Sequence, residues 1–346
     1  MPAKSDSKVV GSSGKKGGSA KWAVLGGLFL AVVIAVQGGW AGLGWAMLKS
    51  SILPGDEGLL AYVPDDAGGV LLVDPHQIEP KALGSESGAV RQWLVRTRED
   101  MKKATGVDLF FDVDKIAVAP SIAVIRGRFD KGGLEKRLGE MSYKPAEHDG
   151  QKYLSRAGED AVCVVDGSLV LYGDAASIAA SLDAKKSGKS MAKKEGVVDR
   201  LEAVGFNHPV LLTISLGEAR PSVRDILTGS TGPKAVTIGL TTLAGLDVDA
   251  AVESQSPASA EELRKLLDEK RQSAGALGPF IGGQAGEVLA GSLKKAELKT
   301  VDAQVVGHMH LTPEELDTVL KAAGSAAPFG ALYKDLRLFQ LLVPGL

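Results

Sequence analysis

The chain has 346 residues, of which 24% are charged and 45% hydrophobic, and this composition is typical of a globular protein with a core of its own. The net charge of −2 is unevenly divided, because residues 1–21 carry five lysines and one aspartate and leave −6 for the remainder. An acidic remainder lacks the clustered Lys and Arg that neutralise phosphates, so nucleic acid is not an expected partner. Cys163 is the sole cysteine, which excludes an intramolecular disulfide and a cysteine-based zinc site.

Residues 22–48 contain no charged side chain and predict a single-pass transmembrane helix, since about 20 apolar residues cross ~30 Å of hydrocarbon. Residues 1–21 lack apolar periodicity, which predicts a disordered tail, and their lysines place this tail in the cytoplasm by the positive-inside rule. The folded part then lies on the far side of the membrane, held by a signal-anchor. A cleaved signal peptide is the competing interpretation, but no small-x-small cleavage site ends the apolar run.

Small residues recur at every fourth position of this predicted helix, namely Gly27, Ala31, Ala35 and Gly39. Such a stripe lets a second helix approach closely, so it predicts helix association and self-association within the membrane. The alternative is that a chain rich in Ala and Gly produces this spacing by chance.

Residues 49–66 are a predicted linker, and an alternation of strands and capped helices begins after it. The first predicted domain, residues 67–190, has apolar runs of strand length at 69–73, 115–119, 122–128, 151–154, 161–165 and 169–172. Asp130 stands before Leu134 and Leu138, and Asp174 before Ile178 and Leu182, which is the pattern of an N-cap followed by apolar residues four apart.

The second predicted domain, residues 191–324, repeats this order. Its predicted strands are 209–216, 235–240, 246–252, 293–298 and 301–311. Ser259 with Glu262 forms a capping box, and Thr312 precedes Pro313 at the start of another helix. The order strand, helix, hairpin, helix in both halves predicts an α+β fold of two related antiparallel sheet-plus-helix units.

Short motifs in the first half carry a resemblance to a known group. They are Val-Pro-Asp-Asp-Ala at 63–67 with the strand at 70–74, Gly-Arg-Phe-Asp at 127–130, and Asp-Gly-Ser-Leu-Val-Leu-Tyr-Gly at 166–173. Over residues 60–185 the chain resembles uncharacterised bacterial envelope proteins that are anchored by one N-terminal helix. This group has no established activity, so the resemblance implies only the layout and a place in the bacterial envelope. Together with the predicted anchor and cytoplasmic tail, this predicts a protein of the bacterial inner membrane with a periplasmic ectodomain.

The sequence contains no HExxH, Cys-x-x-Cys or Gly-x-Ser-x-Gly motif, so neither an enzyme nor a bound cofactor is expected. His308 and His310 are the one pair with ligand-like spacing, because residues two apart on a strand project from the same face. Asp302 and Gln304 are expected on that face too. Two imidazoles with a carboxylate suit zinc, copper or nickel. The alternative is an ordinary polar outer face, opposite Val305, Met309 and Leu311.

Residues 325–346 predict an amphipathic C-terminal helix, whose apolar face carries Phe329, Leu332, Tyr333, Leu336, Phe339 and Val343. This face packs on its own domain or docks on a partner protein or the membrane surface. The chain is therefore predicted to be a membrane-anchored scaffold or protein-interaction component of the cell envelope, with other envelope proteins as partners. The alternatives are a small-ligand or metal-binding envelope module centred on His308 and His310, and a hydrolase with an unrecognised site.

Overall fold

A computed structural model describes residues 56–77, 89–156, 160–216, 233–241, 245–272 and 283–325. Within these ranges the fold is α+β, with eight α-helices and one twelve-stranded antiparallel sheet. No helix in the described ranges is long and apolar enough to cross a membrane. The predicted transmembrane helix with its stripe Gly27, Ala31, Ala35 and Gly39, and the predicted C-terminal helix after Ser325, lie outside the described residues.

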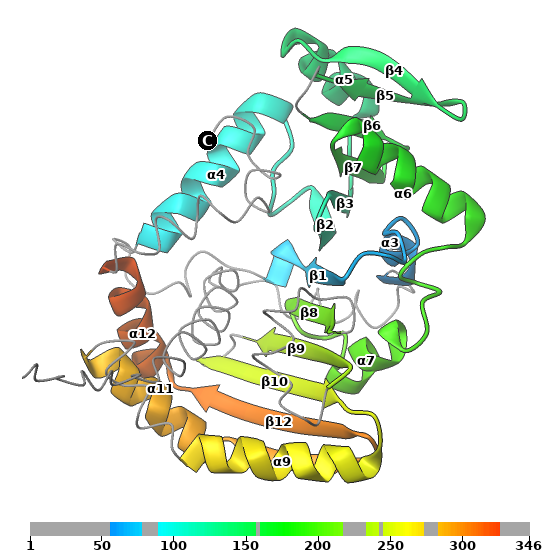
Figure 1. The fold of residues 1–346 in the computed structure, drawn as a ribbon. Coiled ribbons are helices and arrows are strands. Elements are labelled where there is room, and N and C mark those ends of the chain that lie inside the picture. The colour runs from blue at the N-terminus through cyan, green and yellow to red at the C-terminus, as the bar shows by residue number, and fades with distance from the viewer. Residues whose placement is uncertain are drawn as a thin grey trace, which may run out of the picture.

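The sheet runs in the order β11-β12-β10-β9-β8-β1-β2-β3-β7-β6-β5-β4 (Figure 1). Its strands in chain order are β1 Gly69–Val73, β2 Val113–Ala119, β3 Ile122–Gly127, β4 Lys144–His148, β5 Gln151–Ser155, β6 Ala161–Val164, β7 Leu169–Gly173, β8 Val210–Ser215, β9 Ala235–Thr241, β10 Leu246–Glu253, β11 Glu297–Val301 and β12 Gln304–Leu311.

The helices connect these strands. They are α3 Asp56–Leu60, the short 3-10 helix η1 Pro75–Gln77, α4 Ala89–Thr105, α5 Lys131–Glu140, α6 Ala175–Ser187, α7 Val197–Val204, α9 Pro257–Gln272, α11 Gly283–Lys295 and α12 Pro313–Ser325. Asp130 and Asp174 cap α5 and α6 through hydrogen bonds from Gly133 N and Ser177 N, as their positions in the sequence predict.

The two halves of the chain meet at β1 and β8, which pair antiparallel in the middle of the sheet. Leu71 and Leu212 are directly opposite each other in this pair. Outward from β1 the strands are β2, β3, β7 and β6, and outward from β8 they are β9, β10, β12 and β11. The halves therefore build one continuous sheet with the same order of five strands on each side of its centre, and the first half adds β5 and β4 at its edge.

Helices cover the two faces of the sheet unequally. One face, called the α9 face here, packs against α4, α5, α9, α11 and α12 through three apolar clusters. The opposite face, called the α6 face, packs against α3, α6 and α7 through one cluster that includes Leu72, Leu171 and Leu211. In Figure 1, α3, α6 and α7 lie on the right of the sheet and α4, α11 and α12 on the left.

The α6 face is exposed at the end formed by β12 and β11. In the first half, α6 packs on β7 and β6, but α12, which follows β12, packs with α11 on the α9 face. The exposed side chains on the α6 face of these two strands are Glu297, Lys299, Val301, His308 and His310. Among the described helices, none buries this part of the sheet.

The structure differs from the sequence predictions in four places. The residue before α9 that caps it is Ser256 and not Ser259, because the helix begins at Pro257 and the backbone N–H of Ser259 donates to Oγ of Ser256. Residues 56–66 are not a simple linker, because Leu59 and Leu60 of α3, and Val63 after it, are buried in the core. The strand expected at 293–298 is wrong, since α11 continues to Lys295 and β11 begins at Glu297. Strand β4 was not predicted. It contains Pro145, which is tolerated there because β4 lies at the edge of the sheet.

Candidate functional site: a ladder of histidines and aspartates

His308 and His310 lie on β12 and point out from the exposed part of the α6 face, with side chains 49% and 43% exposed. The residues between and around them, Val305, Met309 and Leu311, are buried on the α9 face. This is the alternation expected of a strand with one wet and one covered face. The two imidazoles therefore share one accessible surface.

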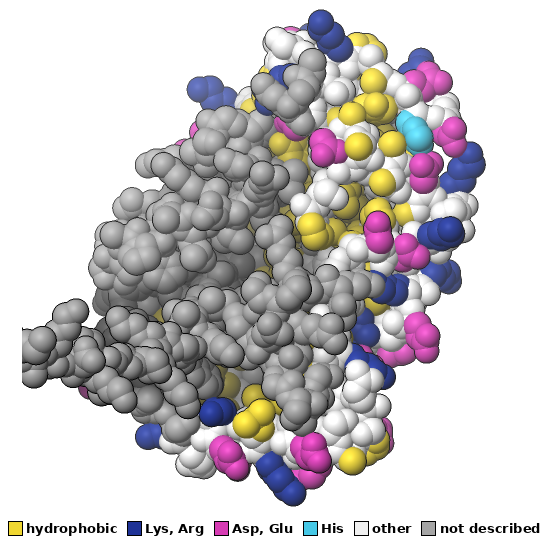
Figure 2. Space-filling view, viewed as in Figure 1, with side chains coloured by type: hydrophobic (Ala, Val, Ile, Leu, Met, Phe, Trp, Pro, Cys, Tyr) yellow, Lys and Arg dark blue, Asp and Glu magenta, His cyan; other side chains and the backbone are white. Residues whose placement is uncertain are grey.

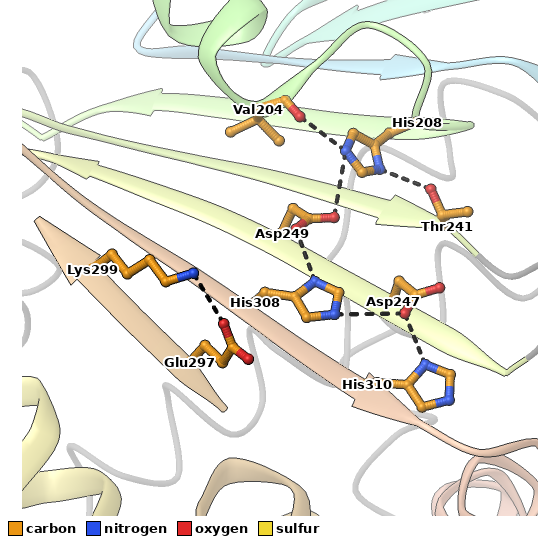
Figure 3. A network of polar contacts seen from close by, with 9 residues as sticks. All are labelled: Val204, His208, Thr241, Asp247, Asp249, Glu297, Lys299, His308 and His310. Carbon is orange, nitrogen blue, oxygen red and sulfur yellow. Dashed lines mark hydrogen bonds and ion pairs between the residues drawn. The ribbon is translucent and has the colours of Figure 1, made fainter. Parts of the chain in front are cut away.

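The neighbouring strand β10 places a carboxylate beside each imidazole. In the antiparallel register Asp249 is opposite His308 and Asp247 is opposite His310. Nδ1 of His308 is 2.9 Å from Oδ1 of Asp249, and Nδ1 of His310 is 2.7 Å from Oδ1 of Asp247 (Figure 3). The site thus consists of two carboxylate–histidine pairs side by side.

These contacts fix which ring nitrogen carries the proton. An ionised carboxylate only accepts hydrogen bonds, so Nδ1 of each imidazole is the donor and a neutral ring then has a lone pair on Nε2. Nε2 of His308 is 3.9 Å from Oδ1 of Asp247, which is too long for a hydrogen bond. Both Nε2 atoms are therefore acceptors without a described donor.

A third imidazole, that of His208, extends the ladder into the protein. Its Nε2 is 3.1 Å from the carbonyl oxygen of Val204 and 3.6 Å from Oδ2 of Asp249, and its Nδ1 is 2.8 Å from Oγ1 of Thr241. The ring is buried and fits because Gly239 has no side chain, since a Cβ there would be 2.4 Å from Cδ2 of His208. His208 thus lies next to Asp249 on the covered side, with its own hydrogen bonds made to Val204 and Thr241.

Each pair of the ladder has the carboxylate contact that is also found at metal-ligating histidines. Metal-ligating histidines usually donate their second ring N–H to a carboxylate, which orients the ring and raises the basicity of the ligating nitrogen. Asp247 and Asp249 hold His310 and His308 in this way. If two imidazole nitrogens bound an ion, its remaining coordination positions would be open to water or to another ligand.

A different group brings three ligand atoms within 4.8 Å of one another, and among the described residues it is the one that does so. It consists of His148 at the end of β4, Asp149 in the following turn and Asp183 on α6. Nζ of Lys186 is 2.6 Å from Oδ2 of Asp149, and this ion pair lowers the pKa of that carboxyl. The ammonium group of Lys186 already occupies one of the two carboxylates of this exposed cluster, which makes it a weaker candidate than the ladder.

Sequence reasoning identified part of the ladder. His308 and His310 share a face with Gln304, as predicted, whereas Asp302 lies in the turn between β11 and β12 with a positive φ of 50°. Asp247, Asp249 and His208 were missed. The alternation of Asp and apolar residues from Leu246 to Val252 was a usable signal, because it places both carboxylates on one face of a strand.

The charged side chains coloured in Figure 2 do not gather into a patch of one sign on the face shown there. In the coloured part of Figure 2, Asp and Glu side chains alternate with Lys and Arg side chains. Several are paired, such as Lys299 with Glu297 at 3.1 Å and Lys186 with Asp149.

Comparisons with known proteins give a distant likeness. No protein-family model matches the chain, and no curated protein matches it. Among solved structures the chain is similar to TP0453 in crystal form III, with a TM-score of 0.43, 12% identity, and coverage of 76% of this chain and 97% of that chain. Form I gives 0.42, 10%, 78% and 98%, and form IV gives 0.44, 11%, 75% and 95%. At these TM-scores the likeness carries no argument about function.

Proposed function

We propose that this chain is a single-pass, membrane-anchored envelope protein without catalytic activity, whose periplasmic part binds a divalent transition-metal ion through His308 and His310. The anchor and the periplasmic location rest on the sequence, namely the uncharged run of residues 22–48 and the lysines before it. The binding role rests on the ladder.

One observation carries the binding role: two carboxylate–histidine pairs lie next to each other on an exposed part of the sheet. Each pair has its carboxylate on Nδ1, at 2.9 and 2.7 Å, so both Nε2 atoms remain available to a ligand. A polar outer face needs no such pairing, because water satisfies exposed imidazoles equally well.

The donor set indicates which ions bind. Imidazole nitrogen suits Zn²⁺, Cu²⁺ and Ni²⁺, whereas Mg²⁺ and Ca²⁺ require oxygen ligands in larger number. The ladder supplies two imidazoles and two carboxylates whose nearest oxygens are already engaged by Nδ1–H groups. We therefore expect zinc, copper or nickel to bind and magnesium or calcium not to compete.

A competition titration tests the proposal. The full chain in detergent is titrated with Zn²⁺ in the presence of a chromophoric chelator, alongside His308→Asn, His310→Asn and the control His76→Asn. His76 is also paired with a carboxylate, Asp114 at 3.3 Å, but lies elsewhere. Either ladder variant should weaken zinc binding at least ~10-fold by removing one of two nitrogen ligands, and the control should bind as wild type.

Two results would contradict the proposal. One is zinc binding that is unchanged in the ladder variants. The other is binding that is lost in His148→Asn and kept in His308→Asn, which would assign the ion to the cluster of His148, Asp149 and Asp183.

The second candidate is the scaffold role, in which the folded part and the predicted C-terminal helix bind other envelope proteins. One observation favours it: the repeated strand order about β1 and β8 builds a long sheet with a free edge at β11. The same order supports the proposal that the two units arose by duplication. Affinity purification of the full chain from its own membranes tests the scaffold role, which fails if no protein is enriched over a control purification from membranes without the tagged chain.

A further inference from the structure

β11 forms one edge of the sheet, and its outer backbone groups have no strand partner among the described residues. An unprotected edge is a template for pairing with another strand. The other edge, β4, contains Pro145, which removes a donor, whereas β11 has no proline in Glu297–Val301. The two edges therefore differ in their capacity to pair.

We propose that β11 pairs antiparallel with β11 of a second copy of this chain, about a two-fold axis at Leu298, so that the sheets of the two copies become continuous. This inference is independent of the proposed metal site. It concerns the same face of the molecule, because the α6 faces of both copies then lie on one side of the joined sheet.

In this register the charged side chains on β11 of one copy are complementary to those on β11 of the other copy. A two-fold axis at Leu298 places Glu297 of each copy opposite Lys299 of the other. Both side chains are exposed, at 67% and 71%, and lie on the α6 face. Opposite charges directly across an antiparallel pair stabilise it, and like charges destabilise it. The axis also brings the two half-buried Leu298 side chains together on the α9 face.

The backbone pattern favours the same register. β11 and β12 are joined by a two-residue turn, so Val301 and Gln304 form a hydrogen-bonded pair, as do Lys299 and Glu297 with their partners. The N–H and C=O groups of Leu298 and Thr300 consequently point to the free edge. A two-fold axis at Lys299 would also use these groups, but it would place two ammonium groups opposite each other.

The new pairing is short. The carbonyl oxygen of Ala296 already accepts a hydrogen bond from Arg271, which ends the free edge on the N-terminal side of β11. We therefore expect weak association in dilute solution. Confinement to a membrane by the predicted anchor would raise the local concentration of the second copy.

Cysteine cross-linking of the full chain in native membranes tests the register. In the proposed dimer, residue 298 faces its own counterpart, so Leu298→Cys should form a disulfide-linked dimer on mild oxidation. Thr300→Cys should not, because its counterpart is about 14 Å away at ~3.4 Å per residue along the strands. Cys163 is buried and serves as the internal background.

Charge variants test the recognition. Adding Lys299→Glu or Glu297→Lys to Leu298→Cys places like charges opposite each other, and each should lower the cross-linked fraction roughly five-fold or more. Co-expression of these two variants should restore it, because one copy then presents two lysines and the other two glutamates. Equal cross-linking of Thr300→Cys, or cross-linking that is independent of these charges, would overturn the proposal. Zinc titration of the same variants measures metal binding by the ladder separately, so a failure of the dimer proposal can be told from a failure of the metal-binding proposal.

Discussion

At the scale of single residues, Asp247 and Asp249 decide what the two exposed imidazoles can do. Each accepts a hydrogen bond from Nδ1 and so leaves Nε2 for a ligand. Asp249→Asn keeps the size of the side chain and removes its charge, so it should weaken zinc binding roughly 10-fold or more. The chelator competition measures this, with Asp114→Asn as the control. An unchanged affinity would show that the carboxylate has no role in holding the ring.

Acidification should release the metal. Protons compete with Zn²⁺ for the same Nε2 atoms, so binding weakens as the pH falls. Measurement of zinc affinity across a pH series checks this, and an affinity that does not change with pH would exclude imidazole ligands.

Asp108 is a second residue whose charge matters, here for stability. Burial alone would raise its pKa, but hydrogen bonds from Arg98 at 2.9 Å and Lys102 at 3.1 Å outweigh burial, so the pKa lies below its ordinary value. A lowered folded-state pKa gives stability that is present above the unfolded-state pKa and is lost as the pH falls through the folded-state value.

Asp108→Asn should therefore lower the free energy of unfolding by about 2 kcal/mol at pH 7, the usual size for a hydrogen-bonded buried charge. The difference from wild type should shrink as the pH falls below the ordinary carboxyl range. Urea denaturation at pH 7 and pH 4 measures both. A difference that grows on acidification would contradict the assigned sign.

At the scale of elements, the connection into β10 depends on one glycine. Gly245 has a φ of +120°, and a Cβ there would be 2.0 Å from the carbonyl oxygen of Leu311. Gly245→Ala should destabilise the fold by at least about 2 kcal/mol, because it adds both backbone strain and a clash with backbone.

Gly291 provides the matched control. It lies within α11, and a Cβ there meets nothing within 4 Å. Gly291→Ala should raise the free energy of unfolding by about 0.5–1 kcal/mol, since alanine loses less entropy than glycine in a helix. Urea denaturation of both variants measures the two changes in the free energy of unfolding. Equal changes would show that the local geometry at Gly245 does not determine the effect of the substitution.

Much of the local structure follows from sequence periodicity. Strands such as β1 and β7 and the capped helices α5 and α6 were predicted near their observed bounds, because an apolar run or an Asp N-cap is a local signal. The pairing of β1 with β8 is not local. For the same reason Asp247 and Asp249 were missed, since their place beside His310 and His308 depends on which strand is the neighbour of β12.

At the scale of the whole molecule, the prediction concerns topology. If residues 22–48 span the membrane with the lysines inside, protease added to spheroplasts should reach the folded part and leave a membrane-bound fragment of about the first 50 residues. Immunoblotting with tags at both ends checks this. Protection of the whole chain would contradict the predicted orientation.

The joined halves explain why the candidate site is accessible. The described helices after β10 and β12 pack on the α9 face, so the α6 face of β12 and β11 keeps its row of exposed polar side chains. In the first half α6 covers the corresponding strands β7 and β6. Because the helices cover the two ends of the sheet unequally, the α6 face presents a polar surface at the end formed by β12 and β11.

The most direct test of the metal-binding role is zinc K-edge X-ray absorption of the zinc-loaded full chain. If His308 and His310 bind the ion, the spectrum should show a shell of two imidazole nitrogens at about 2.0–2.1 Å, and the remaining ligands should be oxygen. In the chain with both His308→Asn and His310→Asn, the imidazole scattering should disappear. Zinc binding through His308 and His310 would be contradicted by a wild-type spectrum without imidazole scattering. It would also be contradicted if the double variant gave the same spectrum as the wild-type chain.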